Sequence, residues 1–154
     1  MTYLLDTNII SAIAPSKKDR PSALVAWIDA ASSGLYLSVV TVAEIRAGVA
    51  KAAREGSARK AEVLCAWWDA IEHLYANRIL AFDLGAATIA GKFIDVAKAA
   101  GHAPGFADVV IAATAKAAGL AVLTRNTKHF DLFGEPALNP FDALPPLPGT
   151  APVP

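Results

Sequence analysis

The sequence is poor in cysteine and histidine and has no net charge. Cys65 is the single cysteine among 154 residues, three residues are histidine, and 14 basic side chains balance 14 acidic ones. One cysteine excludes an intrachain disulfide, as expected in a reducing compartment. Zero net charge excludes a global field that attracts nucleic acid, so a polyanionic partner needs a local basic patch or a bound metal ion.

Long apolar runs are also missing. No run approaches the roughly 20 residues that span a bilayer. The N-terminus has no basic region, and Asp6 interrupts its apolar stretch, which disfavours a signal peptide. From these absences we expect a soluble, cytoplasmic protein without a membrane partner.

The chain does contain enough apolar surface for one domain, because 55% of its residues are hydrophobic. Four short β-branched or aromatic runs predict strands, at residues 3–5, 35–40, 79–82 and 120–124. Apolar residues at helical spacing predict helices, at residues 8–14, 22–32, 41–55, 57–75, 85–100 and 107–119. Strands separated by helices predict a three-layer α/β/α fold around a mostly parallel sheet of four to five strands.

The end of the chain has a different composition. Six of the ten prolines lie from residue 140 onwards. Such a segment is expected to be extended and poorly packed. We therefore expect a folded domain over residues 1–142 and a poorly ordered tail over residues 143–154.

Three acidic residues occupy comparable places in this predicted fold. Asp6 ends the first strand, Glu44 lies near the start of the helix after the second strand, and Asp108 lies in the first turn of the helix before the fourth strand. In a parallel sheet all three face the edge where ligands bind. Asn126 follows the fourth strand toward the same edge. The pattern therefore predicts an acidic cluster.

The surroundings of Asp108 favour a bound cation. Its helix is apolar nearly all round, and a lone carboxylate there is costly unless something pairs with it. Carboxylates that share one cleft also raise one another's pKa. A divalent cation relieves both costs, and oxygen ligands without a cysteine or histidine set favour Mg²⁺ or Mn²⁺ over zinc.

Each acid also has a purely structural interpretation. Asp6 could cap the helix at 8–14, and Glu44 could complete a capping box with Thr41. Asp108 could complement a helix dipole. The joint placement of the three acids on one edge is the argument for a site.

Four motifs in order carry a family resemblance: "LLDTNIIS", "TVAEIRAG", "ADVVIAATA" and "LTRNTKHF". The chain resembles a PIN domain from residue 3 to about 142. More closely, it is similar to the VapC toxins of type II toxin–antitoxin pairs, including the FitB-like branch. The resemblance implies an Mg²⁺- or Mn²⁺-dependent ribonuclease that is held inactive by a cognate VapB-like antitoxin and is usually a homodimer.

By position, the family's acidic metal-binding residues correspond to Asp6, Glu44 and Asp108. Many members have a fourth acid where this chain has Asn126, an amide that can hold water but adds no charge. As catalytic residues we expect these four side chains. For contacts with RNA or with water we expect Asn8, Arg46, Thr124 and Arg125. Further candidates for phosphate contacts are Lys17, Lys18, Arg20 and Lys128.

Two other side-chain groups have competing interpretations. Trp67 and Trp68 are adjacent on a predicted helix and cannot point the same way. One is therefore expected in the core, and the other either lines a dimer or antitoxin groove or also belongs to the core. His129 is interpreted as a loop histidine without a partner.

Two rival functions remain at this point. An aspartyl-phosphate phosphatase also uses an aspartate at a strand end, but it needs a second acid where this chain has Asn8. A non-catalytic module could keep the fold and use the cleft only for a partner, which Asn126 favours.

Overall fold

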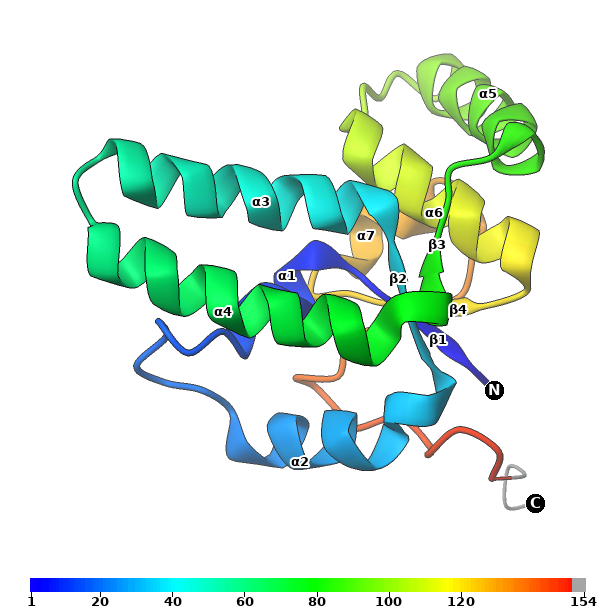
Figure 1. Ribbon diagram of the computed structural model, residues 1–154. Coiled ribbons are helices and arrows are strands. Elements are labelled where there is room, and N and C mark those ends of the chain that lie inside the picture. The colour runs from blue at the N-terminus through cyan, green and yellow to red at the C-terminus, as the bar shows by residue number, and fades with distance from the viewer. Residues whose placement is uncertain (151–154) are drawn as a thin grey trace.

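The computed structural model describes residues 1–150. A five-stranded sheet forms the middle layer in the order β3-β2-β1-β4-β5, and every strand pair is parallel (Figure 1). The strands are β1 Tyr3–Leu5, β2 Leu35–Ser38, β3 Ile79–Leu80, β4 Ala121–Leu123 and β5 Ala137–Leu138. The predicted parallel α/β sheet is therefore confirmed. β5 was not predicted.

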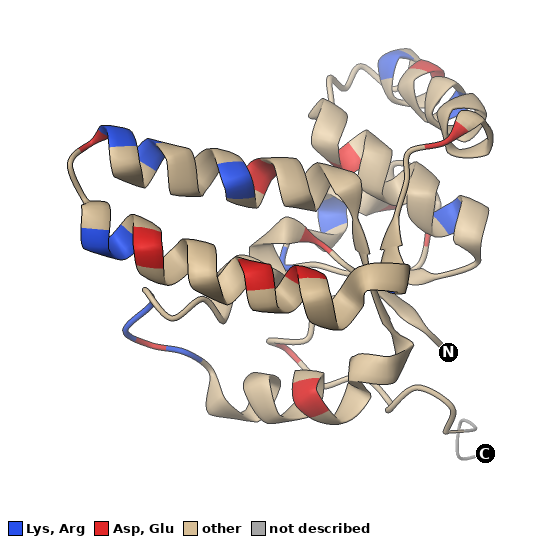
Figure 2. Cartoon of the chain, in the orientation of Figure 1, with Lys and Arg blue, Asp and Glu red and all other residues tan. Residues whose placement is uncertain are grey.

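Seven α-helices connect the strands: α1 Thr7–Ala12, α2 Ser22–Ala31, α3 Val39–Arg54, α4 Ala58–Tyr75, α5 Leu84–Ala99, α6 Phe106–Ala118 and α7 Thr127–Asp131. The long helices α3 and α4 run antiparallel, side by side, as a hairpin that extends beyond the sheet (Figure 1). Charged residues lie on the helices and loops, whereas the strands carry none (Figure 2). Among the described residues we find no helix with the length and apolar character of a membrane span.

Alternation along the strands produces two cores, one on each face of the sheet. Tyr3 and Leu5 of β1 face a core with side chains of α1, α2 and α4. Leu4 faces the opposite core with side chains of α5, α6 and α7. Successive strand residues point to opposite faces, so a fully apolar strand is the pattern expected between two helical layers.

α3 begins two residues earlier than predicted. Its N-cap is Ser38, whose side chain accepts a hydrogen bond from the Val40 backbone N–H at 3.2 Å. The predicted capping box of Thr41 and Glu44 is therefore wrong, because the strand ends at the first hydroxyl residue that can cap the helix. Thr41 is buried inside the helix instead.

The proline-rich end has no helix or strand from residue 143 to 150, yet it is bound to the domain. Trp27 donates from Nε1 to the Pro145 carbonyl at 2.8 Å, and the Tyr3 hydroxyl donates to the Pro146 carbonyl at 2.9 Å. Pro145 is buried. The segment therefore has no regular element but packs onto the domain through its prolines. Residues 151–154 of the predicted tail lie outside the described residues, and the boundary at residue 142 stays a prediction.

Candidate functional site

The strand order changes direction between β1 and β4. The chain builds outwards from β1 to β2 and β3, whereas β4 and β5 lie on the other side of β1. Leu5 pairs with Leu123, and the Asp6 backbone N–H donates to the Leu123 carbonyl at 2.9 Å. This register brings the next residues, Asp6 and Thr124, side by side. In open α/β sheets ligands bind at the carboxyl ends of the strands at such a switch point.

Asp6 is buried at this point, with 5% of its surface exposed. One carboxylate oxygen accepts the Thr7 backbone N–H at 2.7 Å, so Asp6 does cap α1, and the other accepts the Thr124 hydroxyl at 2.7 Å. Burial raises the pKa of Asp6 above its usual 3.8; the charges of Asp108 and Glu44 raise this pKa further, whereas the two hydrogen bonds lower it. The three predicted acids therefore share one electrostatic environment.

Thr7 connects Asp6 to Glu44. Its backbone binds Asp6, while its hydroxyl donates to Glu44 Oε1 at 2.7 Å and lies 2.9 Å from the Thr41 hydroxyl. Glu44 is otherwise exposed in the second turn of α3. Thr7 was not predicted as a site residue; the available signal was a hydroxyl directly after the strand-ending aspartate.

Asp108 lies in the first turn of α6, as predicted, and the helix after it is buried from Val109 to Ala115. One Asp108 oxygen lies 2.8 Å from His129 Nδ1. The prediction that His129 has no partner is wrong. The reason is α7, a short helix absent from the prediction, which places His129 against the start of α6.

The residues after β4 hold this edge together. Asn8 Nδ2 donates to the Thr124 hydroxyl at 3.3 Å, and Asn8 Oδ1 accepts the Arg125 backbone N–H at 3.2 Å. The Asn126 backbone N–H donates to the Thr124 hydroxyl at 3.0 Å. Within residues 1–150 the side chain of Asn126 makes no hydrogen bond, so only its backbone is tied to the acidic cluster.

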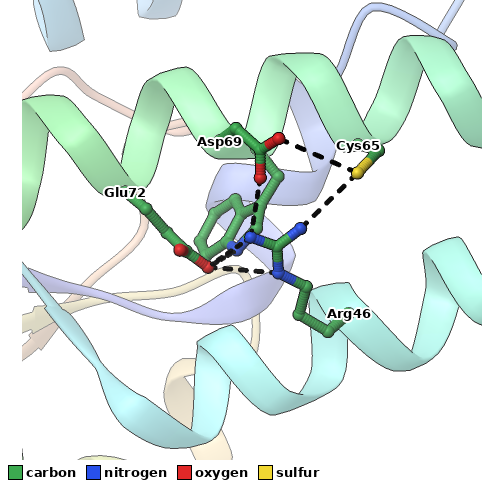
Figure 3. Close-up of polar contacts among 5 residues, drawn as sticks. Arg46, Cys65, Asp69 and Glu72 are labelled. Carbon is green, nitrogen blue, oxygen red and sulfur yellow. Dashed lines mark hydrogen bonds and ion pairs between the residues drawn. The ribbon is translucent and has the colours of Figure 1, made fainter.

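Arg46 is not at this edge. Its guanidinium reaches from α3 to α4, where Nη2 lies 2.8 Å from Asp69 and 3.0 Å from Glu72, and Nη1 lies 3.7 Å from Cys65 Sγ (Figure 3). Two residues along an α-helix differ by roughly 200° in direction. Glu44 and Arg46 therefore point in different directions from α3, and the structure places Arg46 in a contact between helices.

Two clefts share α1 as a wall. The first, of about 240 Å³, contains Glu44 and apolar side chains that include Ile45, Leu64 and Trp67. The second, of about 520 Å³, lies on the Asn8 side of α1. Trp68 is fully buried, which confirms that one of the two tryptophans belongs to the core, while Trp67 faces the first cleft.

The side chains are not arranged as a ready metal cage. In the described part of the chain, no three acidic, histidine or cysteine side chains stand together as a ligand group. The hydrogen bonds explain this arrangement, because Thr7 holds Glu44 and His129 holds Asp108.

Comparison with known proteins identifies the family of this chain. The PIN domain family matches residues 3–135. The chain is 41% identical to VapC ribonuclease Y4jK of Sinorhizobium fredii, over 90% of this chain and 97% of the relative, and 40% identical to toxin FitB of Neisseria gonorrhoeae, over 90% and 97%. Its fold is similar to the crystal structure of FitAcB from Neisseria gonorrhoeae, with a TM-score of 0.81, 39% identity and coverage of 91% of this chain and 99% of that one. The chain therefore belongs to the PIN domain family.

Proposed function

We propose that this protein is a Mg²⁺- or Mn²⁺-dependent endoribonuclease that acts in the cytoplasm as the toxin of a VapBC-like toxin–antitoxin pair. The names of the relatives, VapC ribonuclease and toxin FitB, support this class of activity. The observation that carries the proposal is Asp6, a buried carboxylate whose pKa is raised by burial and by the charges of Asp108 and Glu44 at the switch point of the sheet.

The donor chemistry of these residues suits a divalent cation. A cation next to Asp6 offsets both the burial cost and the repulsion from Asp108 and Glu44. All three donors are carboxylate oxygens, the ligands that Mg²⁺ and Mn²⁺ prefer. Asp6 and Asp108 would hold the ion directly, and Glu44 would do so directly or through water. The second carboxylate oxygen of Asp108 is free of the His129 contact.

The chemistry then follows from the placement of Glu44. When bound, a divalent cation supplies an acidified water and positive charge opposite the phosphate oxygens. Glu44, exposed at the rim of the cluster, takes a proton from the attacking water. The water oxygen bonds to phosphorus, the bond from phosphorus to the 3′-oxygen breaks, and that oxygen takes up a proton. The products carry a 5′-phosphate and a 3′-hydroxyl.

Other side chains position the reactants. Thr124 and Asn8 form a hydrogen-bonded wall beside Asp6, and Asn126 follows that wall at the start of α7. We assign Thr124, Asn8 and Asn126 to orienting water or the sugar–phosphate backbone. Arg125 remains a candidate for a phosphate contact.

A cognate VapB-like antitoxin is the proposed inhibitor, which the similarity to FitAcB and to FitAB bound to a DNA fragment supports. The apolar cleft beside Glu44, lined by Leu64 and Trp67, is the proposed groove for an amphipathic antitoxin helix. We also propose that the toxin is a homodimer in a larger toxin–antitoxin assembly.

The decisive experiment compares RNA cleavage by three proteins: the wild type, Asp6→Asn and Asp95→Asn. Asp95 is an exposed carboxylate on α5 and provides the matched control. With Mn²⁺, the wild type and Asp95→Asn should cleave a cellular RNA pool to 5′-phosphorylated fragments, while Asp6→Asn and chelated wild type should not. Equal cleavage by Asp6→Asn would remove the proposed centre.

A non-catalytic binding module is the second candidate. Two observations favour it: Asn126 adds no charge at the position where many PIN domains have an acid, and His129 occupies one oxygen of Asp108. Binding of Mn²⁺ without cleavage of any RNA would support this module. An aspartyl-phosphate phosphatase has less support, because both ends of the Asn8 amide are used in hydrogen bonds to Thr124 and Arg125.

A further inference from the structure

The larger cleft beside α1 opens directly next to the acidic cluster. We call it the cationic cleft and define it by Asn8, Lys17, Lys18, Arg125 and Phe141. Asn8 forms its inner wall and donates to Thr124, which in turn donates to the carboxylate of Asp6. A ligand in the cationic cleft is therefore connected to Asp6 through two hydrogen-bonded side chains, Asn8 and Thr124.

The cationic cleft carries uncompensated positive charge. Lys17, Lys18 and Arg125 line it together with one acid, Asp19. None of these three cations takes part in the ion pairs found among residues 1–150. Because the whole chain has no net charge, this cluster is a local attraction for a polyanion that would otherwise be repelled by the three nearby carboxylates.

A flat surface completes the cationic cleft. The Arg125 guanidinium lies over the ring of Phe141, 4.5 Å from its centroid. Both side chains are exposed, Phe141 by 39%. The hydrogen bond from the Arg125 backbone to Asn8 fixes the start of this loop against α1. Exposed arginine and aromatic planes are the surfaces on which unpaired nucleobases stack.

We propose that the cationic cleft binds the nucleotide next to the scissile phosphate, with its base on the Arg125–Phe141 pair and its phosphate against Lys17 and Lys18. This inference rests on the proposed ribonuclease function and adds the path of single-stranded RNA to it. The volume of about 520 Å³ suits one nucleotide. The first cleft also contains Lys17, Lys60 and Trp67, but its lining includes the carboxylate of Glu44 and no arginine stacked on an aromatic ring.

The base-stacking half of the proposal is tested by RNA binding without turnover. The full chain carrying Asp6→Asn is titrated with a fluorescein-labelled single-stranded RNA of about eight nucleotides and with an abasic oligomer of the same length. Adding Phe141→Leu should weaken binding of the RNA about tenfold and leave binding of the abasic oligomer unchanged. Phe141→Tyr, which keeps the ring, should bind RNA as the parent does.

The proposed phosphate contacts are tested by removing the lysine charges and by measuring how binding depends on salt concentration. The double substitution Lys17→Gln and Lys18→Gln should weaken binding of the RNA and binding of the abasic oligomer equally. It should also reduce the slope of log affinity against log salt by about 1.4, the value for two phosphate contacts on a single strand. Lys98→Gln is the matched control, because Lys98 is an exposed lysine on α5. Thermal melting confirms that each variant is folded.

The outcomes separate this inference from the proposed function. RNA cleavage by the wild type together with unchanged binding in all cationic-cleft variants overturns the inference alone. Binding that depends on Phe141 without any cleavage by the wild type supports a nucleotide site in the cationic cleft and overturns the nuclease. Preferential binding of an acidic peptide, insensitive to Phe141→Leu, identifies a protein-binding site and overturns the proposed RNA path.

Discussion

The Thr124 hydroxyl donates to the Asp6 carboxylate at 2.7 Å and thereby joins the carboxyl ends of β4 and β1. Both residues are buried, Thr124 completely. The same hydroxyl accepts the Asn126 backbone N–H and the Asn8 amide. One side chain therefore orients the candidate metal ligand and both segments that border it.

Thr124→Val should lower the free energy of unfolding by about 2 kcal/mol at pH 7, because it leaves a buried carboxylate oxygen without its donor. The loss should shrink in acid, where Asp6 is protonated. Urea denaturation at pH 7 and at an acidic pH measures this loss of stability. Thr124→Ser, which keeps the hydroxyl, should stay near the wild type; an equal loss in both variants would point to the methyl group instead.

Asp6 should make the metal-free protein less stable as the pH rises. Its pKa is raised in the folded state above the usual 3.8, so the unfolded chain releases this proton first. The favourable contribution of the protonated carboxyl is complete below about pH 3.8 and is lost as the pH rises through the folded pKa. In the presence of a chelator, the free energy of unfolding of Asp6→Asn should therefore rise relative to that of the wild type over this pH interval. Parallel pH profiles of the two proteins in urea would contradict this.

Mg²⁺ or Mn²⁺ should stabilise the wild type against heat. At a concentration about 100-fold above its dissociation constant, a cation adds about 2.7 kcal/mol, which corresponds to a rise in Tm of about 5 to 10 °C for a chain of this size. Differential scanning calorimetry measures the rise. Asp6→Asn should show none of it, and a rise of equal size in that variant would place the cation elsewhere.

Gly34→Ala should destabilise the protein by about 1–3 kcal/mol through overpacking, since a Cβ at this position would overlap the ring of Pro148. Gly91→Ala is the control: it lies inside α5 with nothing within 4 Å and should gain about 0.5–1 kcal/mol. In a chain truncated after residue 144 the cost of Gly34→Ala should disappear. A cost that persists there would show that Pro148 is not its cause.

Arg46 should contribute to stability and not to RNA binding. A double-mutant cycle of Arg46→Gln and Asp69→Asn should give a coupling of about 0.5–1 kcal/mol, because Arg46 is 37% and Asp69 61% exposed and solvent screens the pair. RNA cleavage by Arg46→Gln should stay within about twofold of wild type. A larger loss of cleavage, without a loss of stability, would restore the substrate role predicted from the sequence.

Much of the fold was predictable where a local pattern had one solution. The run Tyr3–Leu5 is apolar, short and ended by Asp6, and it is the strand that was predicted. β5 and α7 were not predicted, because two and five residues carry too little periodicity to identify an element. Ser38 and Thr41 could both cap a helix, and β2 pairing with β3 as far as Ser38 decides between them.

The sequence by itself determined the α/β class and the placement of Asp6 and Asp108 at the ends of their elements, because hydrophobic periodicity and chain direction are local properties. Only the tertiary structure decided which side chains meet. His129 reaches Asp108, and Phe141 lies beneath Arg125, across separations in sequence that no local pattern encodes. Those contacts depend on how the helices and loops pack around the sheet, and packing is a property of the whole chain.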